Sequence, residues 1–358
     1  MSARRIVVVT SGFPRRSETF ALGEMLALED RGALAAIFAT KPGDGATLQP
    51  NCERLLNRVR VLPAATPAEQ AEVLVRTLEG QAVGGVHGYF AHLPAKVAQV
   101  AAKRLGVPFG FSTHARDARK VTLRELAERA HSAACVIACN SDVAMDIRRT
   151  GATVHLMPHG VDVARFQPRP LPTEPPLQIL AVGRLVEKKG FDVLIKACAQ
   201  LSFPFRLRIV GEGPQRNCLE RLVAGFGVEE HVLFCGAKTH AELPDEYSST
   251  HVVAAPSIID SSGDRDGLPN VVLEAMASGR AVIASDVSAI SSAIVNEETG
   301  LLVPPGDPLA LAAALGRVAA NISLCAELGR GARKRVEQDY EVGQCTERFC
   351  NFLESVYA

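Results

Sequence analysis

The stretch P-R-P-L-P-T-E-P-P, from Pro168 to Pro176, lies near the middle of the 358-residue chain and holds five prolines in nine residues. Proline lacks an amide hydrogen and fixes φ, so neither a helix nor a central strand accommodates such a run. We therefore expect a stiff connector at 169–176, between a first domain at 1–168 and a second at 177–341. The chain length fits two domains.

Short β-branched runs alternate with helical stretches on both sides of this connector. Strands are expected at 5–11, 34–39, 59–62, 83–87, 108–112, 134–138 and 153–157, and then at 177–182, 206–210, 231–234, 251–255 and 281–284. Helices are expected at 17–31, 67–79, 93–105, 121–131 and 141–150, and then at 188–201, 214–225, 239–249, 269–278, 307–320, 323–338 and 342–356. Such alternation predicts an α/β fold with two Rossmann-like parallel-sheet domains. Ligands of such sheets bind outside the carboxyl ends of the strands, so we expect a site in a cleft between facing domains.

The overall charge argues against one class of partner. Lys and Arg number 39, as do Asp and Glu, so the formal net charge is +0 and a generic nucleic-acid binder is not expected. The balance is uneven along the chain, with 22 basic against 15 acidic residues through Pro170 (+7) and 17 against 24 after it (−7). The two halves therefore have different roles.

Nine cysteines without a C-x-x-C pair indicate reduced thiols rather than disulfides or a zinc site, and no metal site is expected. The apolar part of the N-terminus is too short for a signal peptide, and no uncharged run is long enough to span a membrane. We expect a cytoplasmic location, with peripheral contact at the inner face of the membrane left open.

The segment D-G-L-P-N-V-V-L-E, from Asp266 to Glu274, contains the start of a helix, with Pro269 at the first-turn position. Unpaired amides around Gly267, Leu268 and Asn270 would form an anion site together with the helix dipole. The alternative is a surface helix on which Asp266 complements the dipole and Glu274 is solvated.

A second segment, V-G-R-L-V-E-K-K-G from Val182 to Gly190, places Arg184 and Lys189 in one loop after a strand. Two cations at the carboxyl end of a strand suit a pyrophosphate. A solvated loop is the alternative.

Six segments together resemble glycosyltransferase family 4, whose members are retaining transferases of the GT-B fold. They are SGFPRRSETF, GFSTHARD, PHGVDVARF, VGRLVEKKGFDVLIKA, VGEGPQRNCLERL and DGLPNVVLEAMASG, in the order of the family. The SETF and STHARD pieces are most similar to the bacterial exopolysaccharide subgroup, such as the colanic acid enzymes. The resemblance implies a GT-B fold whose final helix, within 342–358, packs back on the first domain.

The resemblance also implies a role for each matching residue. On the donor side, the phosphates would lie on Arg184 and Lys189, the ribose hydroxyls on Glu274, and the pyrophosphate and sugar on the amides of the Gly267–Asn270 turn. The remaining assignments are Lys238 near the nucleobase, Gly12 where the backbone approaches the donor, His114 beside the transferred sugar, and Asp266 towards the sugar hydroxyls.

The implied reaction moves a sugar from a UDP- or GDP-sugar to a hydroxyl with retention at the anomeric carbon. No metal or other cofactor is required, because the cations and the helix terminus can stabilise the leaving diphosphate. Two departures from the family pattern bear on the donor. Asp266 stands where the family has Glu, and the segment from Ser288 to Ile294, S-A-I-S-S-A-I, lacks the paired glycines, the Pro and the Glu of the family.

The first domain would bind the acceptor, which is a sugar, a lipid-linked sugar or a small molecule. Basic residues gather after His114 and in the first loop, namely Arg116, Arg119, Lys120, Arg124, Arg15 and Arg16. Either this basic rim meets an anionic acceptor or lipid headgroups, or it is a solvated face.

Other functions remain as alternatives. A sugar-nucleotide-binding protein with impaired catalysis would fit the altered Ser288–Ile294 loop and Asp266. A GT-B sugar-nucleotide epimerase would need acid–base carboxylates around the hexose, and no segment supplies them. An NAD enzyme would need G-x-G-x-x-G after the first strand, where the chain reads T-S-G-F-P.

Overall fold

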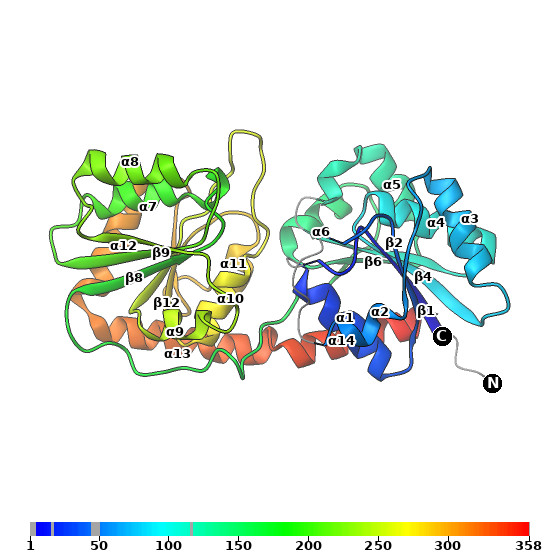
Figure 1. Ribbon diagram of the computed structural model, residues 1–358. Coiled ribbons are helices and arrows are strands. Elements are labelled where there is room, and N and C mark those ends of the chain that lie inside the picture. Colours follow the sequence, from blue (N-terminus) through cyan, green and yellow to red (C-terminus); the bar gives the residue numbers. More distant parts are fainter. Residues whose placement is uncertain (1–4, 16–17, 44–50, 115–116, 358) are drawn as a thin grey trace. The chain divides into compact units, whose positions relative to one another are not determined.

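The structure is a computed structural model that describes residues 5–15, 18–43, 51–114 and 117–357. It divides the chain into two compact units, each with its own parallel sheet between layers of helices (Figure 1). Unit 1 comprises Met1–Gly160 and Gly343–Ala358, and unit 2 comprises Val161–Val342. The division therefore falls at Gly160, and the proline-rich stretch lies inside unit 2.

Unit 1 contains a seven-stranded sheet with the order β3-β2-β1-β4-β5-β6-β7. Its strands are β1 (Arg5–Thr10), β2 (Leu34–Ala39), β3 (Val59–Val61), β4 (Val83–Tyr89), β5 (Phe109–Thr113), β6 (Cys135–Ala138) and β7 (His155–Leu156). Its helices are α1 (Thr19–Asp30), α2 (Glu53–Leu56), α3 (Pro67–Thr77), α4 (Leu93–Leu105), η1 (Asp117–Lys120), α5 (Leu123–Ser132), α6 (Ser141–Arg148) and α14 (Val342–Tyr357). Since β1 lies between β2 and β4, the strand order reverses there, which is where parallel sheets bind ligands.

Alternation of side chains along β1 divides the core of unit 1 into two layers. Val7 and Val9 pack towards α3, α4, α5 and α6, whereas Ile6 and Val8 pack towards α1, α2 and α14. Both faces of central strands such as β1 and β2 are buried, which explains why these strands read as nearly continuous apolar runs, whereas the edge strands β3 and β7 are partly exposed.

The last helix, α14, is fixed in unit 1 by the Tyr357 side chain. The Tyr357 ring fills space that a side chain would occupy at Gly85 and Gly110, where a Cβ would lie 2.1 and 2.3 Å from it. Its hydroxyl lies 2.9 Å from Nδ1 of His87, whose Nε2 lies 2.7 Å from Oγ of Ser112. All five positions are buried, so α14 is part of the core of unit 1.

Unit 2 contains a six-stranded parallel sheet with the order β10-β9-β8-β11-β12-β13. Its strands are β8 (Leu177–Val182), β9 (Phe205–Val210), β10 (Val232–Gly236), β11 (Val252–Ala255), β12 (Ala281–Ser285) and β13 (Leu301–Val303). Its helices are η2 (Glu187–Lys189), α7 (Phe191–Cys198), α8 (Arg216–Phe226), α9 (Leu243–Ser248), α10 (Asn270–Ala277), α11 (Ile290–Ala293), α12 (Pro308–Ala320) and α13 (Ile322–Asp339). The strand order reverses between β8 and β11, so the loops after these two strands flank the expected ligand position.

The expected α/β fold with two Rossmann-like units is thus present in the structure. Four short elements lie outside the predicted set: α2, η1, α11 and β13. Residues 161–166 pack on unit 2, where Phe166 is buried in the core and Val161 forms a bridge with Glu341. These contacts explain why unit 2 begins before the proline-rich stretch.

Candidate functional site

The loop after β8 carries two lysines that share one carboxylate. Lys189 Nζ lies 2.7 Å from Asp266 Oδ2, and Lys188 Nζ lies 3.2 Å from Asp266 Oδ1. Lys188 Nζ is also 3.4 Å from Asp264 Oδ2. Burial favours the neutral form of Asp266, but the two ammonium groups outweigh it and hold the pKa of that carboxyl below its usual value. Two cations and two carboxylates therefore meet at the point where the strand order reverses.

A glycine allows this cluster to form. Gly190 has φ +64°, and a Cβ there would lie 1.9 Å from the carbonyl oxygen of Pro256. Ile258 donates its amide to the carbonyl of Lys188 at 2.9 Å, which joins the loop after β8 to the loop after β11. Any larger residue at position 190 would separate the lysines from the segment that carries Asp266.

Helix α10 begins at Asn270, and Pro269 precedes it with φ −68° and ψ 133°. The expected first-turn position of this proline is therefore wrong by one residue, because its extended ψ places it at the N-cap. In the described part of the chain, the amides of Gly267, Leu268 and Asn270 have no hydrogen-bond acceptor. These groups can therefore serve an anion, as the motif predicts.

Glu274 is buried at 4% exposure, so the alternative of a solvated surface residue is wrong. Tyr247, on α9, donates its hydroxyl to Oε2 at 2.8 Å, and His240 Nε2 lies 3.3 Å from Oε1. Arg165 Nη1 lies 2.9 Å from His240 Nδ1, and since arginine only donates, the proton of a neutral His240 is on Nε2. The carboxylate is thus fixed by two donors that the sequence motifs did not reveal.

The other two predicted cations of unit 2 differ in their surroundings. Lys238 Nζ lies 3.3 Å from Glu242 Oε1 and 3.9 Å from Glu246 Oε1, so it belongs to a local acidic cluster. Arg184 is exposed, and among the described residues it has no ion-pair partner. Arg184 is therefore the cation most available to a ligand at the end of β8.

Ser288 stands where the family resemblance expects a glycine, and its backbone has φ +56°. A residue with a Cβ is strained in this left-handed region. The Ser288 Oγ atom is buried without a hydrogen-bond partner, and the next amide, of Ala289, donates to the carbonyl of Gly267 at 3.4 Å. The departure from the family pattern therefore lies directly beside the turn before α10.

In unit 1, the loop after β1 packs on the loop after β2. A Cβ at Gly12 would lie 2.8 Å from the carbonyl oxygen of Pro42, so packing of the chain itself already requires glycine there. Arg15 follows in the same loop and pairs with Glu18 at 2.7 Å.

His114 follows β5 and is 8% exposed. Its amide donates to Oδ1 of Asp117, whose Oδ2 accepts the amide of Ala91 at 2.6 Å, so this carboxyl joins the loops after β4 and β5. Burial raises the pKa of Asp117 to about 7, although the amide donors oppose the shift. Burial also holds the pKa of His114 well below its usual value, and His159 and His87 add to the effect. The Nδ1 atom of His114 is buried and has no hydrogen-bond partner.

A buried triad that no motif indicated lies next to His114. Glu24 accepts the hydroxyl of Tyr89 at 2.7 Å through Oε2, and its Oε1 lies 3.0 Å from His159 Nδ1. His159 lies in the segment PHGVDVARF, which contributes to the family resemblance but assigns this histidine no role. From the sequence, Glu24 is expected to be a solvent-exposed residue of a helix. The structure shows that its side chain is buried.

The basic rim is only partly present. Arg119 Nη2 lies 2.6 Å from Asp142 and 2.9 Å from Asp146, one turn apart on α6, so this cation is part of an internal ion-pair network. Arg124 is exposed and pairs with Glu128 at 3.2 Å. Lys120 is exposed on η1. Arg16 and Arg116 lie outside the described residues.

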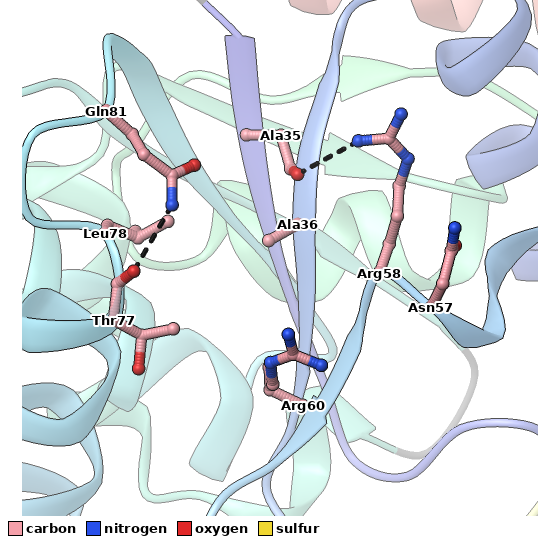
Figure 2. A pocket seen from close by; sticks show the side chains of 8 residues that line it. All are labelled: Ala35, Ala36, Asn57, Arg58, Arg60, Thr77, Leu78 and Gln81. Atoms are coloured by element: carbon pink, nitrogen blue, oxygen red, sulfur yellow. Dashed lines mark hydrogen bonds between the residues drawn. The ribbon is translucent and has the colours of Figure 1, made fainter.

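Two surface hollows are present: the first is remote from these groups, and the second is lined in part by Glu187 and Ile258 and so borders the loop of Lys188 and Lys189. One hollow of about 300 Å³ in unit 1 is formed at the start of β2 and the end of α3, where Arg58 donates to the Ala35 carbonyl (Figure 2). Since it opens near the amino end of β2, it lies at the opposite edge of the sheet from His114. A second hollow, of about 590 Å³, lies over α7 and α8 in unit 2.

The described residues hold no group of three or more His, Cys, Asp or Glu side chains arranged to bind a metal ion. Among the same residues, no single helix is both long and apolar enough to cross a membrane; α12 and α13 together pass by length and composition alone, with a bend of 104° between them.

Comparison with known proteins finds similarity to glycosyltransferases in sequence. Residues 176–321 match the family described as Glycosyl transferases group 1. WcaL of Escherichia coli (strain K12), named as a colanic acid biosynthesis glycosyltransferase, is 34% identical over 202 residues, which cover 55% of this chain and 50% of WcaL. The amylovoran biosynthesis glycosyltransferase AmsK of Erwinia amylovora is 33% identical over 182 residues, or 50% of this chain and 45% of AmsK. The chain thus spans about half the length of these relatives.

Among solved structures, the Anabaena protein Alr3699/HepE in complex with UDP matches 98% of this chain and 100% of its own, with a TM-score of 0.82 and 18% identity. This likeness confirms the expected fold of two Rossmann-like domains. The resemblance to glycosyltransferases that the motifs indicated is likewise confirmed by the sequence matches.

Proposed function

We propose that the protein is a retaining glycosyltransferase, because residues 176–321 match the family Glycosyl transferases group 1. It transfers a sugar from a nucleoside diphosphate sugar to an acceptor hydroxyl in the synthesis of a polysaccharide or other glycoconjugate. The names of WcaL and AmsK, which refer to colanic acid and amylovoran, favour an exopolysaccharide. The UDP of the Anabaena structure makes UDP-sugars the first donors to test and GDP-sugars the second.

The observation that carries this proposal is the cluster of Lys188 and Lys189 on Asp266, beside a turn of unpaired amides. Cations and free amides at the carboxyl edge of a parallel sheet match a diphosphate, which needs several hydrogen-bond donors around one anionic group. In the reaction these groups would stabilise the charge that develops as the diphosphate leaves. Glu274 would accept the ribose hydroxyls, and Lys238 would lie near the base.

His114 would contact the transferred sugar in unit 1. Its depressed pKa suits a neutral ring that supports the reacting centre through hydrogen bonding, and no side chain needs to attack the sugar. In the front-face course implied by the family resemblance, the leaving phosphate helps to remove the proton of the acceptor hydroxyl. Gly12 would allow the backbone to approach the donor.

The acceptor is proposed to carry negative charge, from a phosphate or from an anionic lipid surface. His92, at the start of α4, has its pKa lowered to about 4, first by burial and then by Lys120, Lys41, Arg129 and Arg15. Several cations therefore act on one position at the carboxyl edge of unit 1. Carboxylates pair with Arg15 and Arg129 of this cluster, as they do with Arg119 and Arg124 of the predicted rim. The proposal therefore rests on Lys41 and Lys120, which form no ion pair among the described residues.

The test is a thermal-shift screen of the full chain against UDP-, GDP- and ADP-sugars, followed by calorimetry. A donor present at 100 times its Kd would stabilise the protein by about 2.7 kcal/mol. Lys189→Ala should lower turnover by about 100- to 1000-fold. Lys196→Ala is the matched control, because Lys196 also pairs with an aspartate, Asp192, but on the outer face of α7. Kinetics of Lys189→Ala within threefold of wild type, or no shift with any donor, would contradict the proposal.

A further inference from the structure

The ring of His114 is stacked on a second imidazole whose charge is set by a buried carboxylate. The centroids of His114 and His159 lie 5.0 Å apart with the planes inclined by 8°. Phe20 covers both rings, with centroids 4.7 Å from His114 and 4.1 Å from His159. The two imidazoles therefore share one largely apolar enclosure.

Hydrogen bonds favour the cationic form of His159. Glu24 uses one oxygen to accept from Tyr89 and the other to face His159 Nδ1 at 3.0 Å, so both oxygens are used as acceptors, as in an ionised carboxylate. Burial alone would lower the pKa of His159, but Glu24 and the neighbouring Cys139 thiol outweigh it and raise the pKa to about 10. His159 and Glu24 thus form a largely buried ion pair at neutral pH, in which the His159 side chain is 18% exposed.

The groups around His114 offer little charge that would compensate a second cation at acidic pH. Phe20 on α1, Tyr89 on β4 and Phe90 after β4 are aromatic. His87 on β4 is kept neutral by burial, with its pKa near 3. Asp117 on η1 accepts the amides of Ala91 and His114, and because burial raises its pKa to about 7 it loses its negative charge at more acidic pH, where His114 would take up a proton. A proton on His114 would therefore sit directly against the imidazolium of His159.

We propose that Glu24 and His159 are a positioning pair that keeps the His114 ring neutral, so that its unpartnered Nδ1 can bind a hydroxyl group of the substrate. A neutral imidazole has one nitrogen that donates a hydrogen bond and one that accepts. A hydroxyl group can bind to either nitrogen, because it can both donate and accept. The identity of the hydroxyl-bearing ligand rests on the proposed glycosyl transfer. The effect of the His159 charge on the protonation of His114 does not depend on the proposed glycosyl transfer.

The experiment is an NMR titration of the full chain labelled with [¹³Cε1]histidine, in which His114→Gln assigns the His114 signal. In the wild type we expect the midpoint of the His114 titration to lie well below the ordinary histidine value of about 6.5. Glu24→Gln and His159→Gln each remove the neighbouring positive charge, and at 5.0 Å its loss should move the midpoint of the His114 titration up by about 1–2 pH units. His131→Gln is the control, because His131 is exposed on α5 and contacts only the carbonyl of Thr150 through its ring.

Two results would overturn this inference: a wild-type midpoint near 6.5, or a midpoint that both variants leave unchanged. Glu24→Gln keeps the size of the side chain, so it provides the test even if His159→Gln does not fold. Once a donor and acceptor are known, the acid limb of kcat/KM should move to higher pH by the same interval in Glu24→Gln. Absence of transferase activity would refute the proposed function but leave the NMR result intact, so the two failures are distinguishable.

Discussion

Replacing Asp266 by Asn should change stability and nucleotide affinity in opposite directions. Asp266 holds Lys189 at 2.7 Å and Lys188 at 3.2 Å, and all three side chains are at most 20% exposed. The substitution keeps the shape of the side chain but leaves two ammonium groups with less compensation. We therefore expect unit 2 to be less stable and its cations to be more available to a diphosphate.

The two magnitudes follow from burial and distance. Ion pairs at the surface contribute about 0–1 kcal/mol, and breaking a fully buried pair costs about 3–5 kcal/mol, so this partly buried cluster should lose about 1–3 kcal/mol. A phosphate placed on the lysines would lie about 7 Å from the carboxylate. Removing that repulsion is worth about 0.6–2.4 kcal/mol at an effective dielectric constant of about 80 to 20, or about 3- to 60-fold in Kd.

The assay is isothermal calorimetry with UDP and GDP, together with urea unfolding, on the Asp266→Asn variant. Asp192→Asn is the control, because Asp192 pairs with Lys196 at 2.8 Å on an exposed face of the same unit. An affinity for both nucleotides that stays equal to that of the wild type, or becomes weaker, would show that the lysines do not receive the diphosphate. The contribution of the ionised Asp266 to stability should also disappear as the pH falls through its depressed pKa.

Four further outcomes are expected. Glu274→Gln should weaken donor binding by about 1–3 kcal/mol in calorimetry, since Gln replaces one acceptor oxygen by a donor, and an unchanged Kd would contradict the ribose role. Ser288→Gly should stabilise unit 2 by about 1 kcal/mol in thermal unfolding by relieving the positive φ; destabilisation would show that the buried hydroxyl matters more. Tyr357→Phe should cost about 1–2 kcal/mol because His87 Nδ1 loses its partner, whereas full stability would mean that packing alone anchors α14. Since His87 has its pKa near 3, it resists protonation in the folded state, and it should reduce stability by about 1.4 kcal/mol per pH unit as the pH falls from 6.5 towards 3; His87→Gln should flatten that part of the urea-derived profile.

The strands and most helices could be predicted because both faces of each sheet are buried. A strand such as β1, with Ile-Val-Val-Val at residues 6–9, then shows an uninterrupted apolar run. The missed strand β13 has only three residues, which is too short for a period to be read. The missed helix α2 has only four residues, too few to show a helical period in the sequence. Its Leu55 side chain packs in the core of unit 1, and this contact cannot be read from the sequence.

The proximity of the two predicted segments, Val182–Gly190 and Asp266–Glu274, follows from the parallel sheet, because each segment comes after a strand. The partners of the predicted site residues could not be predicted, since contacts such as Tyr247 with Glu274 and Arg119 with Asp142 join separate elements. A carboxylate such as Glu24 has the same local pattern whether it faces water or the core. Only the position of α1 against β4 decides that it accepts a buried tyrosine hydroxyl.

The two units offer different chemistry at equivalent places of the same topology. In unit 2 the loop after the first strand supplies the ammonium groups of Lys188 and Lys189. They pair with Asp266 and could bind an anionic ligand instead. In unit 1 the corresponding edge presents aromatic rings and an imidazole held in a low-charge enclosure, with cations further along near His92. Since the sheets share their strand order, topology cannot be the source of this difference. The difference arises from the loop residues. We therefore expect that substitutions in these loops, with the strands unchanged, can change the substrate preference among related proteins.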